Sequence, residues 1–157
     1  GSTATVERVG EPSSKIDALK LLDQQEITDI GFELHRASIV IGIGMGIGNR
    51  ENLPLIRSLA ESIGASLAAT RSVTDAGWLP KQLQIGLTGR AIAPKLYIAI
   101  GIRGDFNHMV GVQKSGTIVA INSNAQHPIF QVADYGIVGD YISYLPPFIE
   151  ALTPMVD

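Results

Sequence analysis

The chain has 157 residues, a length that suits one compact domain with its own hydrophobic core. Charged residues make up 17% and the formal net charge is -3, so the sequence lacks the basic stripe that a nucleic-acid-binding protein needs. The chain has no cysteine, which excludes disulfides and thiolate chemistry, and no apolar run approaches the roughly 20 residues of a membrane-spanning helix. We therefore expect no nucleic-acid partner, no membrane insertion and, because nothing resembles a secretory signal, a cytoplasmic location.

The beginning of the chain has little core-forming pattern. Residues 1–15 are small and polar, and we interpret them as a tag remnant and linker that precede one domain over residues 16–157. Ile16–Leu22 predicts a short edge strand, and Glu26–Arg36 predicts a turn or short helix.

Aliphatic and β-branched runs recur along the rest of the chain and are typical of strands buried on both faces. The runs with this pattern are Ser38–Ile43, Leu96–Ile100 and Thr117–Ile121. Ser66–Thr70 predicts another short strand. Ile129–Val132 and Gly136–Val138 predict short strand or turn segments.

Helical patterns alternate with these strands. Apolar residues at helical spacing predict a helix over Glu51–Ile63 that ends at Gly64. A further helix is predicted to begin near Asp105. Leu145–Leu152 predicts a last helix, with the prolines at 146–147 in its first turn, where proline is tolerated. This alternation predicts an α/β fold of three layers, Rossmann-like, with a mostly parallel sheet.

Glycine-rich turns follow two of the predicted buried strands, at Gly42–Gly48 and Gly101–Gly104. Ligands of parallel sheets bind beyond the carboxyl ends of strands, where glycine lets the backbone approach a phosphate. The first turn does not fit the G-x-G-x-x-G fingerprint, because Ile47 or Asn49 stands where the third glycine is needed. A P-loop is excluded as well, since no Gly-Lys-Ser/Thr follows. The turns therefore indicate either a nucleotide site of another kind or tight turns for helix packing.

Hydrolytic or acid–base catalysis has little support in the sequence. The chain has three histidines, with no nucleophile elbow and no histidine–carboxylate cluster at metal-ligand spacing. We expect a histidine in such a domain to have a structural role more often than a catalytic one. His108 is the exception, because it follows Gly101–Gly104 at a predicted helix start and could face a ligand there.

Several segments together carry a family resemblance. In chain order they are Thr70–Pro80 (TRSVTDAGWLP), Gln84–Arg90 (QIGLTGR), Ala93–Ile102 (APKLYIAIGI), Asn107–Gly111 (NHMVG), Thr117–Asn122 (TIVAIN) and Pro128–Asp140 (PIFQVADYGIVGD). In this order and spacing, from about Ala37 to Leu152, the sequence resembles the C-terminal FAD domain of electron-transfer flavoprotein alpha subunits. The resemblance implies an FAD cofactor and a deoxyhypusine synthase-like fold, related to that of sirtuins, that lacks the usual fingerprint. A fold without this fingerprint agrees with the first glycine turn, whose spacing does not match G-x-G-x-x-G.

The resemblance implies roles at the flavin end of the cofactor. Arg71 matches an arginine over the isoalloxazine ring, where a guanidinium would stabilise negative charge. Without the family, we would interpret Arg71 as part of a surface salt bridge. Thr88 matches a threonine whose hydroxyl reaches flavin N5, and Gly86 and Gly89 would let the backbone approach the ring. His108 matches a histidine near the pyrimidine edge, which would favour anionic reduced forms if it were protonated.

Further residues match the other end of FAD. Gly104 and its neighbours match the pyrophosphate segment, while Asn122 and Asp140 match residues that hold adenosine. Asp140 is also well placed to cap the helix that follows it. The full set implied for FAD is Thr70, Arg71, Ile85, Gly86, Leu87, Thr88, Arg103, Gly104, Asp105, Phe106, Asn107, His108, Asn122, Asp140 and Tyr141.

The sequence departs from the family pattern near the pyrophosphate. Met45 stands where the family has an arginine, Arg103 replaces a serine, and Asn107 replaces a glutamine. We hypothesise that Arg103 supplies the positive charge that Met45 lacks. Asp105 would then either pair with Arg103 or cap the next helix.

The leading interpretation is an electron carrier rather than a substrate-converting enzyme. It would bind FAD and shuttle electrons between a flavin dehydrogenase and an acceptor oxidoreductase, in a heterodimer with an electron-transfer flavoprotein beta subunit. The resemblance further implies that these 157 residues do not include the N-terminal domain of such an alpha subunit. Two alternatives are an NAD-dependent enzyme on the related sirtuin-like fold and an assembly module with an altered cofactor site.

Overall fold

A computed structural model describes residues 30–152 of the chain. The strands are β1 (Ile39–Ile43), β2 (Ser66–Ala69), β3 (Leu96–Ile100), β4 (Thr117–Asn122) and β5 (Tyr135–Val138). The helices are α1 (Ile30–Arg36), α2 (Leu53–Ser62), α3 (Arg71–Asp75), α4 (Phe106–Met109), α5 (Ile129–Val132) and α6 (Tyr141–Leu152), with short 3-10 helices η1 (Met45–Ile47), η2 (Arg50–Asn52) and η3 (Lys81–Leu83). The predicted tag remnant and linker at residues 1–15 and the predicted strand over Ile16–Leu22 lie outside the described residues.

The five strands form one parallel sheet in the order β2-β1-β3-β4-β5. The chain first moves outward from β1 to β2 and then returns to the other side of β1 for β3. The strand order therefore reverses between β1 and β3, and such a switch point opens a crevice at the carboxyl ends of the two strands.

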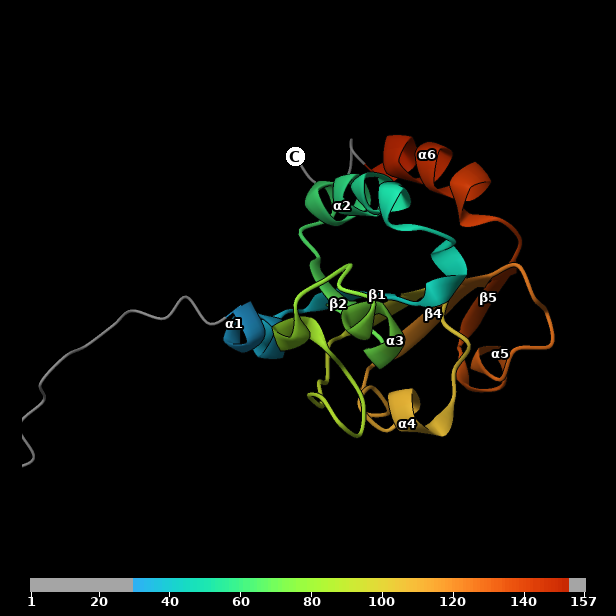
Figure 1. Ribbon diagram of the computed structural model, residues 1–157. Coiled ribbons are helices and arrows are strands. Elements are labelled where there is room, and N and C mark those ends of the chain that lie inside the picture. Colours follow the sequence, from blue (N-terminus) through green and yellow to red (C-terminus); the bar gives the residue numbers. More distant parts are fainter. Residues whose placement is uncertain (1–29, 153–157) are drawn as a thin grey trace, which may run out of the picture.

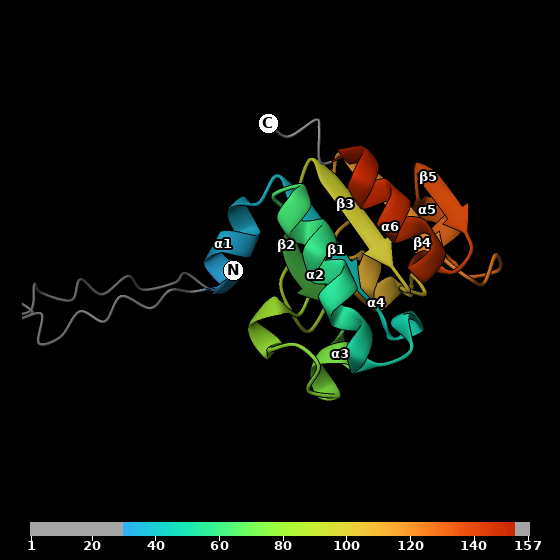
Figure 2. The same ribbon diagram turned by 90° about the horizontal axis from the view of Figure 1, so that it is seen from above.

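The helices form layers on both faces of the sheet. Figures 1 and 2 show α2 and α6 together over one face, and α4 and α5 lie on the opposite side in Figure 1. Helices on both faces require the central strands to be apolar throughout. The predicted three-layer, Rossmann-like α/β fold with a parallel sheet is thus confirmed. In residues 30–152, no helix combines the length and apolar character needed to cross a membrane.

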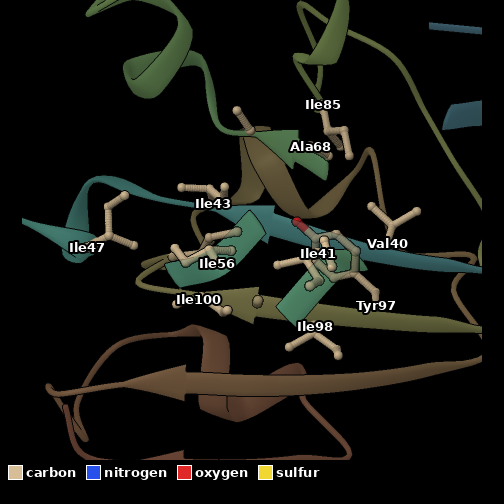
Figure 3. Packing of buried hydrophobic residues seen from close by; sticks show 14 of the residues in the cluster. Val40, Ile41, Ile43, Ile47, Ile56, Ala68, Ile85, Tyr97, Ile98 and Ile100 are labelled. Carbon is tan, nitrogen blue, oxygen red and sulfur yellow. The ribbon is translucent and has the colours of Figure 1, made fainter. Parts of the chain in front are cut away.

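The core lies around β1 and β3. Ile41, Ile43 and Ile100 are fully buried, and Figure 3 shows them packed with Tyr97 and Ile56. Gly42 makes room for the tyrosine, because a Cβ at this position would lie 1.8 Å from Tyr97 Oη. The first glycine of the predicted nucleotide turn therefore serves packing.

Two predictions of secondary structure were wrong. Residues 129–132 form a short helix instead of a strand or turn, because their backbone bonds to Arg103 and within the turn instead of joining the sheet. The last helix begins at Tyr141 instead of Leu145, since Asp140 accepts a hydrogen bond from the Ile142 N–H at its start. The prolines at 146–147 consequently lie inside the helix and not in its first turn.

Candidate functional site

A cleft of about 570 Å³ lies at the carboxyl ends of β1, β2 and β3. This volume falls in the usual range for small-molecule sites. Loops that are far apart in the sequence meet here because the parallel strands end at the same edge of the sheet. Ten of the fifteen residues predicted to contact FAD line the cleft: Thr70, Arg71, Ile85, Leu87, Thr88, Arg103, Gly104, Asp105, Asn107 and His108.

Glycine backbone forms the floor of the cleft. The Gly44 N–H donates to the Ile100 carbonyl, and the Gly46 N–H donates to the Gly101 carbonyl, both at 2.9 Å. A Cβ on Gly44 would lie 2.2 Å from the Gly101 carbonyl oxygen. Gly101 itself has a φ of 63°, a conformation that other residues rarely adopt. The two loops can touch only because both lack side chains, so a ligand in the cleft meets main chain here.

A second close approach joins the loop after η3 to α4. The Leu87 N–H donates to the Asn107 carbonyl at 2.7 Å, and Gly86 has a φ of 124°. A Cβ on Gly86 would lie 2.4 Å from the same carbonyl oxygen. Gly86 thus brings Leu87 and Thr88 close to His108 in the folded chain.

A line of side-chain hydrogen bonds holds Thr88. Gln84 is 5% exposed, and its Nε2 donates to Thr88 Oγ1 at 3.0 Å. The other end of the amide, Oε1, accepts from Thr74 Oγ1 at 2.8 Å. Thr88 is itself exposed to the cleft, so its hydroxyl is held from behind by a buried amide.

Arg71 projects from the first turn of α3. Its Nε lies 3.2 Å from Asp75, and Lys81 Nζ lies 2.8 Å from the same carboxylate. The hydrogen bonds from Lys81 and Arg71 hold the pKa of Asp75 below its usual value. The arginine side chain is 66% exposed, so this pair adds little to stability. The surface salt bridge that residue chemistry alone favoured is present, and Arg71 also faces the cleft.

His108 is buried against Tyr97. The tyrosine hydroxyl lies 2.8 Å from His108 Nε2, and the histidine is 7% exposed. Desolvation lowers the pKa of His108 to about 4, against weaker opposing effects of the Ile85 backbone and Asp105. Nδ1 is buried and has no hydrogen-bond partner of good geometry within residues 30–152. The ring is therefore neutral at pH 7. The protonated His108 that would favour anionic reduced flavin is not produced by the protein alone.

Arg103 and Asp105 form an ion pair at the other end of the cleft. Arg103 Nε lies 3.0 Å from Asp105 Oδ1, and both side chains are more than 60% exposed. Asp105 precedes α4, yet its side chain makes no capping hydrogen bond. Of the two roles expected for Asp105, pairing with Arg103 is confirmed and capping is wrong. Met45 lines the same cleft as this pair.

Comparison with known proteins decides the family. The sequence model of the electron transfer flavoprotein FAD-binding domain matches residues 33–113, more than half of the chain. The chain belongs to this family.

Curated relatives agree with the assignment to the electron transfer flavoprotein family. The electron transfer flavoprotein subunit alpha of Mycobacterium tuberculosis (strain ATCC 25618 / H37Rv) is 46% identical over 114 residues, which cover 73% of this chain and 36% of the relative. The corresponding Pseudomonas aeruginosa subunit is 40% identical over 152 residues, covering 97% and 49%. The mitochondrial subunit of Arabidopsis thaliana is 45% identical over 120 residues, covering 76% and 33%. The chain thus spans between a third and a half of the length of these relatives.

Five of the predicted FAD residues do not line the cleft. Gly86 is buried, and Phe106 is 76% exposed. Asn122 is buried, with Nδ2 donating to the Ile102 carbonyl at 2.8 Å. The Tyr141 hydroxyl donates to the Ile47 carbonyl at 2.8 Å, while Asp140 directly precedes α6 and accepts from the Ile142 N–H. Asn122 and Tyr141 therefore anchor the backbone of two loops that border the cleft.

Sequence reasoning left several lining residues out of the predicted set: Gly44, Met45, Gly46, Ser72, Gly101, Ile102 and His127. The glycine turns had signalled Gly44, Gly46 and Gly101 as a nucleotide-type loop. His127 had no signal, because it arrives from the loop after β4. Its Nδ1 is buried without a hydrogen-bond partner.

The cleft fits an FAD cofactor of this flavoprotein family. Its floor is glycine backbone without side chains, and two of its lining residues, His108 and His127, each have a buried Nδ1 without a hydrogen-bond partner. Two guanidinium groups, Arg71 and Arg103, stand at the cleft for an anionic ligand. Among residues 30–152 no cluster of histidine and carboxylate groups could hold a metal ion.

Proposed function

We propose that this chain binds FAD in the cleft between the ends of β1 and β3 and carries electrons through it. One observation supports this most strongly. Side chains and glycine backbone that are dispersed over the sequence converge on one cleft at the strand-order switch point, in a chain of the electron transfer flavoprotein family. A bound flavin would supply the redox chemistry, and the protein would bind it, orient it and adjust its environment.

The flavin ring belongs at the Thr88 end of the cleft in this proposal. Arg71 would place positive charge near the ring, because its guanidinium is always protonated. The Thr88 hydroxyl would hydrogen-bond to N5. His108 would lie at the pyrimidine edge as a neutral ring.

The pyrophosphate belongs at the glycine floor. Gly44, Gly46 and Gly101 line the cleft and pack backbone against backbone, so no side chain of their own would separate a phosphate from the main chain. We propose that Arg103 supplies the charge here that Met45 cannot. Asp105 opposes this role, since it neutralises part of the Arg103 charge at 3.0 Å.

The adenosine part would extend beyond the cleft toward the start of α6. Asp140 is exposed there, and one carboxylate oxygen is engaged by the Ile142 N–H. The other oxygen can accept from ribose hydroxyls or the adenine amine. Asn122 and Tyr141 would then shape this region through the loops that they anchor.

The relatives are more than twice as long as the matched segment, so the partners are also proposals. We propose that this chain works as part of an alpha subunit with an electron-transfer flavoprotein beta subunit. The complex would receive electrons from a flavin dehydrogenase and pass them to an acceptor oxidoreductase.

A titration tests the proposal. FAD is added to the purified chain, and the flavin absorption and fluorescence are recorded, followed by reduction with dithionite and reoxidation. Saturable binding with reversible bleaching is the expected result. A chain that does not bind FAD would support the assembly-module alternative, and hydrolysis of added NAD would support an enzyme. Riboflavin serves as a control ligand that lacks the pyrophosphate.

A further inference from the structure

Gln84 is a buried side chain that does not line the cleft and lies directly behind Thr88 of the candidate flavin site. It is 5% exposed, between Thr74 of α3 and Thr88 of the cleft wall. Burying an amide is costly unless its polar atoms are satisfied. Both ends of this amide have partners, at 2.8 Å for Oε1 and 3.0 Å for Nε2.

The main chain fixes where this amide stands. The Gln84 carbonyl accepts from the Arg90 N–H at 2.8 Å, and the following Ile85 N–H donates to the Ala69 carbonyl at 2.9 Å. Gly89 packs so closely that a Cβ would lie 2.3 Å from the Gln84 carbonyl oxygen. The loop from Gln84 to Arg90 is therefore closed on itself, with Thr88 at its exposed side.

The orientation of the Gln84 amide, with Oε1 toward Thr74 and Nε2 toward Thr88, sets the direction of these hydrogen bonds. Thr74 Oγ1 donates to Gln84 Oε1 and shares that proton with the Arg71 carbonyl at 2.9 Å. Gln84 Nε2 donates onward to Thr88 Oγ1. An amide nitrogen cannot accept, so the proton of the Thr88 hydroxyl is not used toward Gln84. Within residues 30–152, Thr88 Oγ1 has no other hydrogen-bond partner.

We propose that Gln84 is a positioning residue that makes the Thr88 hydroxyl a hydrogen-bond donor to the cleft. Such a site selects ligands that present an acceptor atom to Thr88. The inference rests on the proposed function for the identity of the ligand. In oxidised FAD the acceptor would be N5, and Gln84 would set this preference without touching the cofactor.

The test compares the affinity of the full chain for FAD and for 5-deazaFAD. The analogue carries a C–H in place of N5 and has no acceptor there. We expect the wild-type chain to bind FAD about tenfold more tightly, the size of one well-formed hydrogen bond. Thr88→Val should reduce the preference to about one, because it removes the donor.

Three variants test the role of the amide. Gln84→Leu removes the donor to Thr88 and should lower the preference to about threefold. Gln84→Glu, when ionised, accepts the Thr88 proton and should abolish the preference. Thr74→Val leaves Gln84 in place and should lower the preference about twofold. Gln113→Leu is a matched control, since Gln113 is exposed outside the cleft and should leave the preference unchanged.

The outcomes separate the two proposals. A wild-type chain that binds neither flavin overturns the proposed function itself. A wild-type chain that binds FAD and 5-deazaFAD equally overturns this inference alone. A Gln84 amide that presents Oε1 to Thr88, in place of Nε2, would overturn it as well. Unchanged preference in Gln84→Leu and Gln84→Glu has the same consequence. If thermal unfolding shows that both are misfolded, Thr74→Val decides the question.

Discussion

The two ends of the candidate site are built by opposite means. At the Thr88 end, buried side chains hold one another: Gln84 holds Thr88, and Tyr97 contacts His108. At the other end, Gly44 and Gly101 form the wall by lacking side chains, and the charged group, Arg103, is exposed. The properties of the first end depend on which buried side chains are present and on how far burial removes them from water. The second depends on glycines that let two backbone segments touch and on an exposed charge that solvent screens.

The largest effect is expected where the glycine floor is filled. In Gly44→Ala the new Cβ would lie 2.2 Å from the Gly101 carbonyl, so the ends of β1 and β3 must separate. We expect the free energy of unfolding to fall by about 3 kcal/mol, as for strong overpacking, with loss of FAD binding. Denaturant unfolding and FAD titration measure both.

Gly64→Ala is the matched control for this substitution. Its φ of 62° strains an alanine, but nothing lies within 4 Å of the new Cβ. A cost of about 1 kcal/mol with normal FAD affinity is expected. Equal effects of the two substitutions would show that close approach at Gly44 is unimportant.

The buried end should respond to pH through His108. Its pKa is about 4 when folded, below the ordinary value of 6.5. Between these values the unfolded ring binds a proton that the folded ring does not, so acid favours unfolding. The free energy of unfolding is therefore highest above pH 6.5 and falls by about 3 kcal/mol as the pH is lowered to 4. Denaturant unfolding at a series of pH values checks this.

His108→Gln should remove that part of the pH dependence, whatever it does to stability at pH 7. His35→Gln is the control, since His35 is exposed on α1. A slope that is the same in His108→Gln and the original chain would show that the ring is not buried as a neutral group.

A smaller effect is expected at Tyr141. A substitution there distinguishes a hydroxyl that anchors the Ile47 loop from one that contacts the cofactor. Tyr141→Phe leaves the Ile47 carbonyl without its 2.8 Å partner and should cost about 1.5 kcal/mol of unfolding free energy. Tyr144→Phe, at an exposed position, should cost almost nothing. A loss of FAD affinity without loss of stability would instead make the Tyr141 hydroxyl a cofactor contact.

The smallest effect is expected at the exposed charge. Arg103→Ser should weaken FAD binding about fivefold, and Asp105→Asn should strengthen it about twofold by releasing the arginine. Both effects should shrink at high salt. Arg57→Ser on α2 is the control. Unchanged affinity in Arg103→Ser would contradict the proposed replacement of the charge missing at Met45.

The strands and the location of the site were predictable because they follow from local patterns. Continuous apolar runs gave β1, β3 and β4 almost to the residue, and glycines after two of them marked the cleft. The segment 129–132 was mistaken for strand or turn because so short an apolar run fits several structures. The helix formed by this segment depends on a backbone hydrogen bond from Ile129 to Arg103, a residue that is distant in the sequence.

The sequence by itself determined the layered parallel fold, the family resemblance and most of the residues around the cleft. The tertiary structure alone decided what those residues do to one another. It paired Arg103 with Asp105, buried His108 against Tyr97 and placed Gln84 behind Thr88. These relations depend on distance, burial and hydrogen-bond direction between separate loops, which no local pattern encodes.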